Sequence, residues 1–140
     1  MNNIHATLIN YQNKGILLIG KSGYGKSDLA LRFIEEKGAK LVADDQVILR
    51  KENNNIYGTA PDNIAGKLEV RGIGICEFDY LKETKIDLCV ELTSSIDDIE
   101  RMPNDEFINF LGISITKIKI YPFECSTICK IVTKTSSIIS

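Results

Sequence analysis

The sequence lacks the signals of several large classes of protein. Its only histidine is His5, and its four cysteines show no CxxC spacing, so the sequence supports neither a zinc site nor a disulfide framework. The cysteines are expected to be reduced, structural thiols. Lysine and arginine together number 17 against 19 aspartate and glutamate residues, and the resulting net charge of −2 argues against a nucleic-acid partner.

Long apolar segments are absent as well. No stretch approaches the roughly 20 consecutive apolar residues that a membrane-spanning helix needs, and the N-terminal MNNIHATLIN has neither the basic nor the apolar region of a signal peptide. We therefore expect a cytoplasmic protein without membrane contact. The 140 residues, 44% hydrophobic and 26% charged, predict one globular domain over residues 1–140 with a frayed tail from about residue 130.

Hydrophobic patterning predicts an α/β domain that is rich in strands and has few helices. Apolar residues from Leu29 to Ile34 recur at helical spacing and Gly38 ends the pattern, which predicts a helix of about three turns. The apolar runs 15–19 and 40–43 flank this helix, and such a βαβ order predicts parallel pairing of the two strands. Further expected elements are strands over 6–11, 86–92 and 115–121 and a hairpin of 47–50 with 56–59. A shaped, glycine-rich loop between short strands is expected over 64–75, and a β-prone end over 129–140.

The clearest motif lies between the strand 15–19 and the helix. Residues 20–27 read GKSGYGKS, which satisfies the P-loop pattern G-x-x-x-x-G-K-[ST]. At such a turn the backbone N–H groups and the helix N-terminus converge on an anion. Lys26 would reach the β and γ phosphates, and the Ser27 hydroxyl would bind Mg²⁺. The expected phosphate-binding residues are Gly20, Lys21, Ser22, Gly23, Tyr24, Gly25, Lys26 and Ser27.

Two carboxylates follow the strand 40–43. Asp44 and Asp45 stand where the strand reaches the edge of the sheet that carries the P-loop, because parallel strands end at one edge. One carboxylate can hold Mg²⁺ through water, and its neighbour can accept a proton from the attacking nucleophile. Phosphate binding alone leaves ATPases, small-molecule kinases and nucleotide switches open. A GTPase is disfavoured, because no guanine-specificity motif of the N/T-K-x-D kind is present.

Four motifs stand at a characteristic joint spacing: His5 fifteen residues before Gly20, the glycine loop itself, LVADD at 41–45, and LEVRGIGI at 68–75. In these motifs the sequence resembles the catalytic, C-terminal domain of the HPr kinase/phosphorylase family, in the short form without the N-terminal domain. A weaker likeness continues through Arg101 and residues 110–113.

This resemblance implies a P-loop kinase domain with a central mixed β-sheet. It also implies an Mg²⁺-dependent protein-serine kinase that transfers phosphate from ATP or pyrophosphate to a serine of HPr, a phosphocarrier protein. Many members of the family also remove this phosphate by phosphorolysis, and the long members form hexamers, so a homo-oligomer is an option here. The implied metal-binding residues are Ser27, Asp44 and Glu69, and the implied catalytic residues are His5, Lys26, Asp44, Asp45, Arg71 and Arg101, with Asp45 favoured as the base and Asp44 as the acid on the metal side.

One stretch departs from the family pattern. Long members carry a loop with arginines near the C-terminus that is associated with dephosphorylation, whereas residues 121–126 here read YPFECS. Glu124 in this stretch is expected to repel phosphate, so the resemblance implies a kinase with weak phosphorolysis. The alternative is a regulatory module that binds nucleotide and does not phosphorylate HPr. The set Asp44, Asp45 and Glu69 favours the kinase, because a module that only binds nucleotide does not need it.

Overall fold

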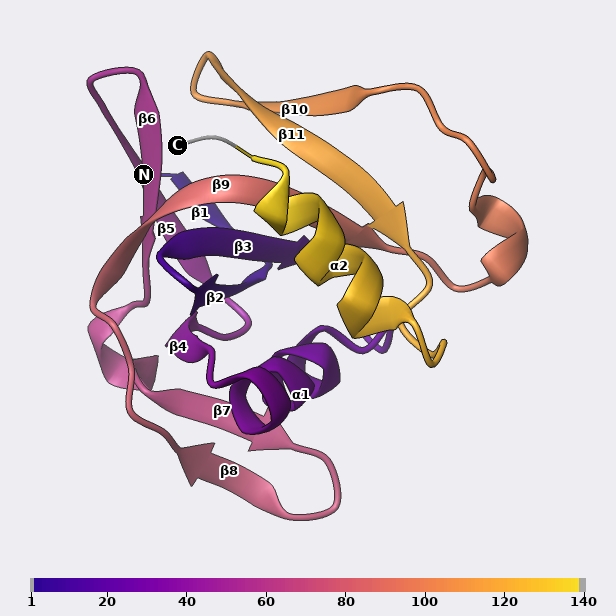
Figure 1. The fold of residues 1–140 in the computed structure, drawn as a ribbon. Coiled ribbons are helices and arrows are strands. Elements are labelled where there is room, and N and C mark those ends of the chain that lie inside the picture. The colour runs from indigo at the N-terminus through magenta and orange to yellow at the C-terminus, as the bar shows by residue number, and fades with distance from the viewer. Residues whose placement is uncertain (1, 139–140) are drawn as a thin grey trace.

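The computed structural model describes residues 2–138, and one curved, mixed β-sheet forms its centre (Figure 1). The strands of this sheet lie in the order β1-β5-β6-β9-β3-β2-β4. β11 pairs in parallel with residues 88–92 of β9, beyond the residues that pair with β6, and also pairs with β10. The strands are β1 (Asn2–Ile4), β2 (Thr7–Tyr11), β3 (Lys14–Ile19), β4 (Lys40–Ala43), β5 (Val47–Glu52), β6 (Asn55–Thr59), β7 (Lys67–Val70), β8 (Gly74–Glu77), β9 (Glu83–Leu92), β10 (Glu106–Phe110) and β11 (Ile113–Ile120). The helices are α1 (Lys26–Lys37) and α2 (Thr127–Ser136), with short 3₁₀ turns at Asp62–Ile64 (η1) and Ile96–Asp98 (η2).

Strand β2 separates the two strands that were expected to pair. β3 and β4 run in the same direction, but each pairs with β2 in antiparallel fashion, so the prediction that they pair directly is wrong. The reason is local: Gln12 and Asn13 adopt φ angles of 50° and 65°, which make a tight hairpin between β2 and β3. This hairpin occupies the edge of β3 that the returning strand would need. The other edge of β3 pairs in parallel with β9.

Two segments fold differently from their expected form. Residues 64–75 were expected to be a loop but contain β7 and the start of β8, which pair as a separate two-stranded sheet. Its turn includes Gly72 at a φ angle of 88°, and β8 begins at Gly74 with a φ angle of 121°. The C-terminal stretch, expected to be β-prone and frayed, contains the helix α2, which buries Ile128 and Ile131. Burial of this face outweighs the low helix propensity of its β-branched residues. Residues 139–140 lie outside the described residues.

The remaining expected strands and the helix α1 are confirmed. Gly38 ends α1 in the left-handed conformation, as its position after the periodic apolar residues predicts. β10 and β1 had not been predicted, and both are short strands at the margins of the sheet. Neither helix among the described residues is long and apolar enough to cross a membrane.

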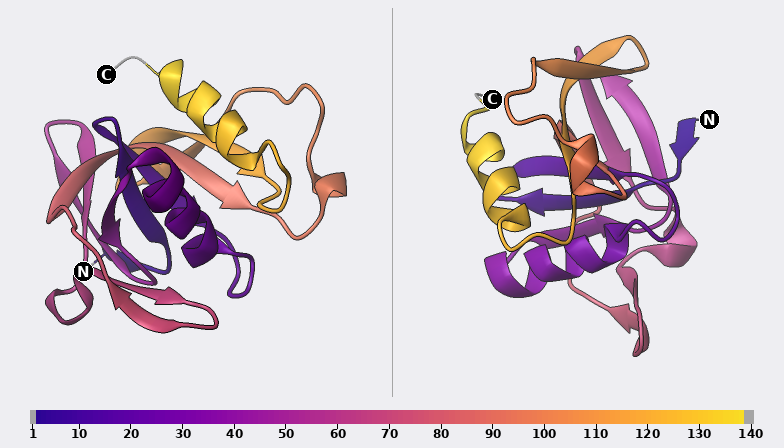
Figure 2. Two further views of the ribbon diagram at one scale, coloured as in Figure 1. Left: turned by 60° about the horizontal axis from the view of Figure 1, so that its bottom comes forward. Right: turned by 90° about the vertical axis from the view of Figure 1, so that its right-hand side faces the viewer.

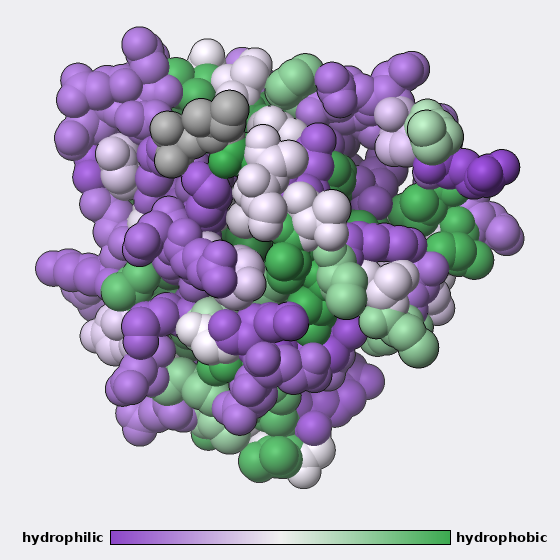
Figure 3. Space-filling model, viewed as in Figure 1, coloured by the Kyte–Doolittle hydropathy of each residue, from purple (hydrophilic) through white to green (hydrophobic). Residues whose placement is uncertain are grey.

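The helices α1 and α2 pack on the same face of the sheet (Figure 2). Their buried residues, including Phe33 and Ile131, join Ile16 and Leu18 of β3 in one apolar cluster. Leu17, between them in the sequence, belongs to a second cluster on the opposite face. This alternation is the period of two that a strand buried on both faces requires. The outer surface beside α2 is mostly hydrophilic, with small separate apolar areas (Figure 3).

The four cysteines have different environments, although all are free thiols. Cys89 is buried in β9, and burial raises the pKa of its thiol to about 12, so it stays protonated at neutral pH. Cys125 and Cys129 are exposed at the beginning of α2. The expectation of structural thiols therefore holds for Cys89 and is wrong for these two.

The close approach of the paired strands β3 and β9 at Gly15 can be tested by substitution. A Cβ atom at Gly15 would lie 1.9 Å from the carbonyl oxygen of Lys85, a backbone atom that cannot move without displacing β9. We expect Gly15→Ala to lower the free energy of unfolding by about 3 kcal/mol or more, measured by urea unfolding. The matched control is Gly72→Ala, where a Cβ meets no atom within 4 Å and only the φ of 88° opposes it. Its expected cost is about 1 to 2 kcal/mol, and equal costs for the two variants would contradict the packing argument.

Candidate functional site

The glycine loop connects β3 to α1 and wraps around the ammonium group of Lys26. Gly23 and Gly25 adopt φ angles of 87° and 94°, which L side chains rarely take, so both positions favour glycine. Lys26 is 7% exposed. Its Nζ donates to the carbonyl oxygens of Gly20 at 2.9 Å and Lys21 at 3.3 Å. The loop therefore curves around a fixed positive charge at the N-terminus of a helix, which is an arrangement suited to a polyanion.

Charge and burial act in opposite directions on this lysine. Burial lowers the pKa of Lys26 below its ordinary value, and the negative charges of Asp45 and Asp44 offset part of that effect. Both carboxylates therefore lie close enough to stabilise the ammonium form. A bound phosphate would add negative charge and favour the ammonium form further.

Asp44 joins three segments of the chain at one buried carboxylate. The residue is 7% exposed and directly follows β4. Its Oδ1 accepts hydrogen bonds from Ser27 Oγ at 2.7 Å and from Thr7 Oγ1 at 2.8 Å. Its Oδ2 accepts a long hydrogen bond from the backbone N–H of Glu69 at 3.4 Å. The carboxylate is thus oriented by α1, β2 and β7 together, and it cannot turn away from Ser27 without leaving donors unpaired.

Asp45 has the opposite environment, although it is the next residue. Its φ of 72° turns the side chain away from that of Asp44, and the side chain is 70% exposed. One carboxylate oxygen lies 3.2 Å from His5 Nε2. The two neighbouring acids are therefore divided between a buried role beside Ser27 and an exposed role beside His5.

These residues line one cavity of about 490 Å³. From the glycine loop, Ser22, Gly23 and Gly25 reach its surface together with Lys26. Gly20 and Lys21 contribute carbonyl oxygens to Lys26 instead, and Tyr24 packs against the hydrophobic core. The predicted site residues that line the cavity are His5, Lys26, Ser27, Asp44, Asp45, Glu69 and Arg71. Arg101 is exposed in the segment after η2 and does not line it.

Two further lining residues escaped the sequence analysis. Thr7 could have been found, because it follows His5 by two residues at the beginning of a strand and so lies on the same face. Leu8 pairs with Ala43, which brings Thr7 beside Asp44 in the next step along the ladder. Phe123 carries no local signal, because its position depends on the fold of the loop before α2.

The loop before α2 also corrects an expectation about Glu124. Its carboxylate accepts a hydrogen bond from Lys130 Nζ at 2.8 Å, and the residue does not line the cavity. The idea that Glu124 repels a bound phosphate is therefore wrong. Phe123 is the residue of this stretch that reaches the cavity, and no arginine lies between residues 121 and 126.

The oxygen atoms around Ser27 fit a magnesium ion. The Ser27 hydroxyl and the Asp44 carboxylate are hydrogen-bonded to each other, and Glu69 lines the same cavity. Hard oxygen ligands of this kind suit Mg²⁺. Among the described residues, no group of three or more His, Cys, Asp or Glu side chains could hold a metal ion alone.

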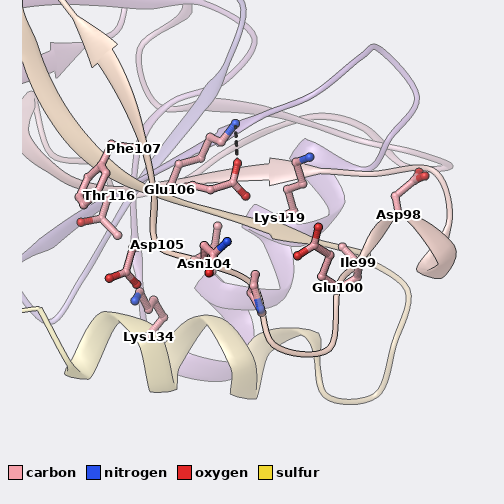
Figure 4. A pocket seen from close by; sticks show the side chains of 13 residues that line it. Asp98, Ile99, Glu100, Asn104, Asp105, Glu106, Phe107, Thr116, Lys119 and Lys134 are labelled. Atoms are coloured by element: carbon pink, nitrogen blue, oxygen red, sulfur yellow. Dashed lines mark ion pairs between the residues drawn. The ribbon is translucent and has the colours of Figure 1, made fainter.

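A second cavity of about 340 Å³ lies between residues 98–107, β11 and α2 (Figure 4). It shares no lining residue with the first cavity, and carboxylates and lysines line it together. Lys117 in its wall donates to Glu91 at 2.8 Å, and this hydrogen bond raises the pKa of Lys117. None of the residues predicted for catalysis or phosphate binding belongs to this cavity.

Comparison with known proteins identifies the family. Residues 1–137 match the profile described as HPr Serine kinase C-terminal domain. The chain belongs to this family. Two HPr kinase/phosphorylases are similar to it. That of Caldicellulosiruptor bescii is 38% identical over 127 residues, which cover 83% of this chain and 40% of the relative. That of Clostridium botulinum is 34% identical over 127 residues, which cover 84% of this chain and 41% of the relative. The chain thus spans about two fifths of the length of these relatives.

A solved structure supports the fold of this domain. The structure of the Hpr(Ser) kinase/phosphatase from Coxiella burnetii matches with a TM-score of 0.82 at 24% sequence identity, covering 97% of this chain and 96% of that chain. The predicted family resemblance and the predicted α/β fold with a central mixed sheet are therefore both confirmed.

The hydrogen bond from Thr7 to Asp44 gives a second test. Thr7→Val keeps the shape of the side chain but removes a donor from a buried carboxylate, so we expect the free energy of unfolding to fall by about 1.5 to 3 kcal/mol. The matched control is Thr135→Val, because Thr135 is also buried but donates to the neutral carbonyl oxygen of Ile131. We expect a loss of about 1 kcal/mol there. Urea unfolding of both variants decides the point, and equal losses would show that Asp44 does not depend on Thr7.

Proposed function

We propose that this domain transfers a phosphoryl group from ATP or pyrophosphate to a serine of an HPr-like phosphocarrier protein, with Mg²⁺ as cofactor. The observation that carries the proposal is the Ser27–Asp44 hydrogen bond of 2.7 Å beside the glycine loop that encloses Lys26. It places two oxygen-bearing side chains that suit a metal ion beside the glycine loop in one cavity. Membership of the HPr kinase family supports the choice of acceptor, and an HPr-like acceptor agrees with the expected cytoplasmic location.

The donor side of the reaction follows from the buried residues. The backbone N–H groups of the glycine loop and the Lys26 ammonium would bind the phosphates of the donor. Ser27, Asp44 and Glu69 would hold Mg²⁺, which when bound neutralises charge on the transferring phosphoryl group. Thr7 keeps the Asp44 carboxylate facing Ser27. These groups are in place before the donor arrives, so little rearrangement is needed.

The acceptor side follows from the exposed residues. Asp45 would accept the proton of the attacking serine hydroxyl as its oxygen bonds to phosphorus and the bond to the leaving phosphate breaks. His5, 3.2 Å from the Asp45 carboxylate, would orient it. Asp44 suits this role less, because its Oδ1 already accepts two hydrogen bonds. Arg71, which lines the cavity from the end of β7, would add positive charge opposite the phosphates.

A second candidate is a regulatory module that binds nucleotide and leaves HPr unmodified. The observation that favours it is the position of Arg101 outside the cavity. Such a module would bind nucleotide with Mg²⁺ and show no transfer to HPr. The assignment of Asp45 distinguishes the two candidates, because only a kinase needs a base.

The proposal predicts separate effects on binding and transfer. When the unaltered chain is incubated with purified HPr, labelled ATP and Mg²⁺, we expect phosphoserine to form on HPr. Asp45→Asn should reduce the rate of transfer about 10²-fold or more and change the nucleotide affinity by less than about threefold. Lys26→Ala and Ser27→Ala should lower both. Asp97→Asn, at an exposed carboxylate in η2 away from the cavity, is the control. Full transfer by Asp45→Asn together with weakened Mg²⁺ affinity would assign the base to Asp44, and nucleotide binding without transfer by the unaltered chain would favour the regulatory module.

The same site predicts a slow reverse reaction. Phosphorolysis brings inorganic phosphate against a phosphoserine that carries about −1.5 to −2 charge, so it needs positive charge beyond Lys26. Residues 121–126 supply no arginine for this purpose. We expect release of phosphate from serine-phosphorylated HPr in excess inorganic phosphate to be at least about tenfold slower than the forward reaction. Comparable rates would show that another cation, such as Arg71, is sufficient.

A further inference from the structure

Phe123 is an exposed aromatic residue in the wall of the phosphate-binding cavity. Its side chain belongs to the few large apolar side chains at the surface, and the residue is 59% exposed. It contacts the glycine loop at its last glycine: a Cβ atom at Gly25 would lie 3.2 Å from Cζ of the ring. The ring therefore lies at the cavity wall beside the N-terminus of α1.

The loop that carries Phe123 is held from several directions. The Arg32 guanidinium of α1 donates to the carbonyl oxygen of Pro122 at 2.6 Å. Thr127 Oγ1 donates to the carbonyl oxygen of Tyr121 at 2.9 Å and accepts from the N–H of Glu124 at 3.1 Å. The ring of Tyr121 packs edge-on against that of Phe123, with centroids 5.7 Å apart. The exposed ring is therefore held in position by the backbone around it rather than by burial.

Charged groups and three apolar residues, Leu31, Val70 and Phe123, line the cavity, and of these three Phe123 alone carries an aromatic ring. Lys26, Ser27 and Asp44 suit phosphates and a metal ion, and none of them offers an apolar surface. Pyrophosphate has no apolar surface either, so Phe123 would gain nothing from it. The base of a nucleotide has a flat π-face that stacks on aromatic side chains. The cavity volume of about 490 Å³ also lies in the range typical of small-molecule sites.

We infer that Phe123 stacks on the base of a nucleotide donor, and that the chain therefore prefers a nucleoside triphosphate to pyrophosphate. This inference rests on the proposed function and adds the class of donor to it. Stacking tolerates any base, so the ring selects for the presence of a base and not for its identity. The alternative roles of the ring are to shape the glycine loop through Gly25 or to contact the acceptor protein, and each has a different outcome in the tests below.

Fluorescence provides the first test, because the chain contains no tryptophan. Phe123→Trp introduces the sole indole at the position of the ring. We expect ADP with Mg²⁺ to quench its emission and pyrophosphate with Mg²⁺ to leave it unchanged, because only ADP stacks. The control is Phe107→Trp, at a position that is 62% exposed and lines the other cavity. It should respond to neither ligand, and an equal response of Phe123→Trp to ADP and pyrophosphate would overturn the inference.

Calorimetric titration of ADP and pyrophosphate provides the second test. We expect Phe123→Ala to weaken ADP binding about tenfold and to change pyrophosphate binding by less than about twofold, while Phe123→Trp binds ADP like the unaltered chain. An equal loss for both ligands would assign the ring to loop shape and overturn the inference. Unchanged ADP binding with a raised KM for HPr would overturn it in favour of acceptor contact. Failure of the unaltered chain to bind either ligand would refute the proposed function itself, whereas binding of pyrophosphate alone would refute only the stacking.

Discussion

The site depends on the hydrogen bonds that converge on the buried Asp44 carboxylate. A charge in this position is costly unless it is paired and fully hydrogen-bonded. Ser27 and Thr7 each donate to one of its oxygens, and the N–H of Glu69 approaches the other. These donors come from a helix, a strand of the main sheet and the separate two-stranded sheet, so the requirement to satisfy one carboxylate ties together three parts of the fold. The pair Ser27 and Asp44 is thereby oriented as a consequence of folding.

Local sequence patterns predicted the helices and strands better than they predicted which strands pair with each other. The apolar periodicity and Gly38 gave α1, and the alternation of apolar residues gave the strands of the core. Pairing could not be obtained in the same way, because a buried strand shows which faces are covered but not which strand lies beside it. The hairpin turn at Gln12 and Asn13 decided that β2, and not β4, lies next to β3. The helix α2 was missed because its β-branched residues favour strands locally, while its stability comes from burial against the sheet.

In the candidate site too, residues with a local sequence signature were predictable, whereas residues placed by distant contacts were not. The P-loop motif, the two aspartates and the segment with Glu69 and Arg71 were predictable, because each carries a short signature, and the structure brings them to one cavity. Thr7 was predictable in principle from its distance of two residues to His5. Phe123 was not, because its place depends on contacts such as that of Arg32 with Pro122, which are 90 residues apart in the sequence. Arg101 matched only a short context, and the structure does not bring it to the cavity.

The central position of β9 has a consequence for how the chain reaches this structure. Gly15 of β3 aligns with Ile86 of β9, so the pairing that supports the glycine loop closes over a separation of roughly 70 residues. On a ribosome, β2, β3, α1 and β4 emerge well before β9 is synthesised, and one edge of β3 is without its partner during that time. Unpaired strand edges of this kind are where nascent chains associate wrongly.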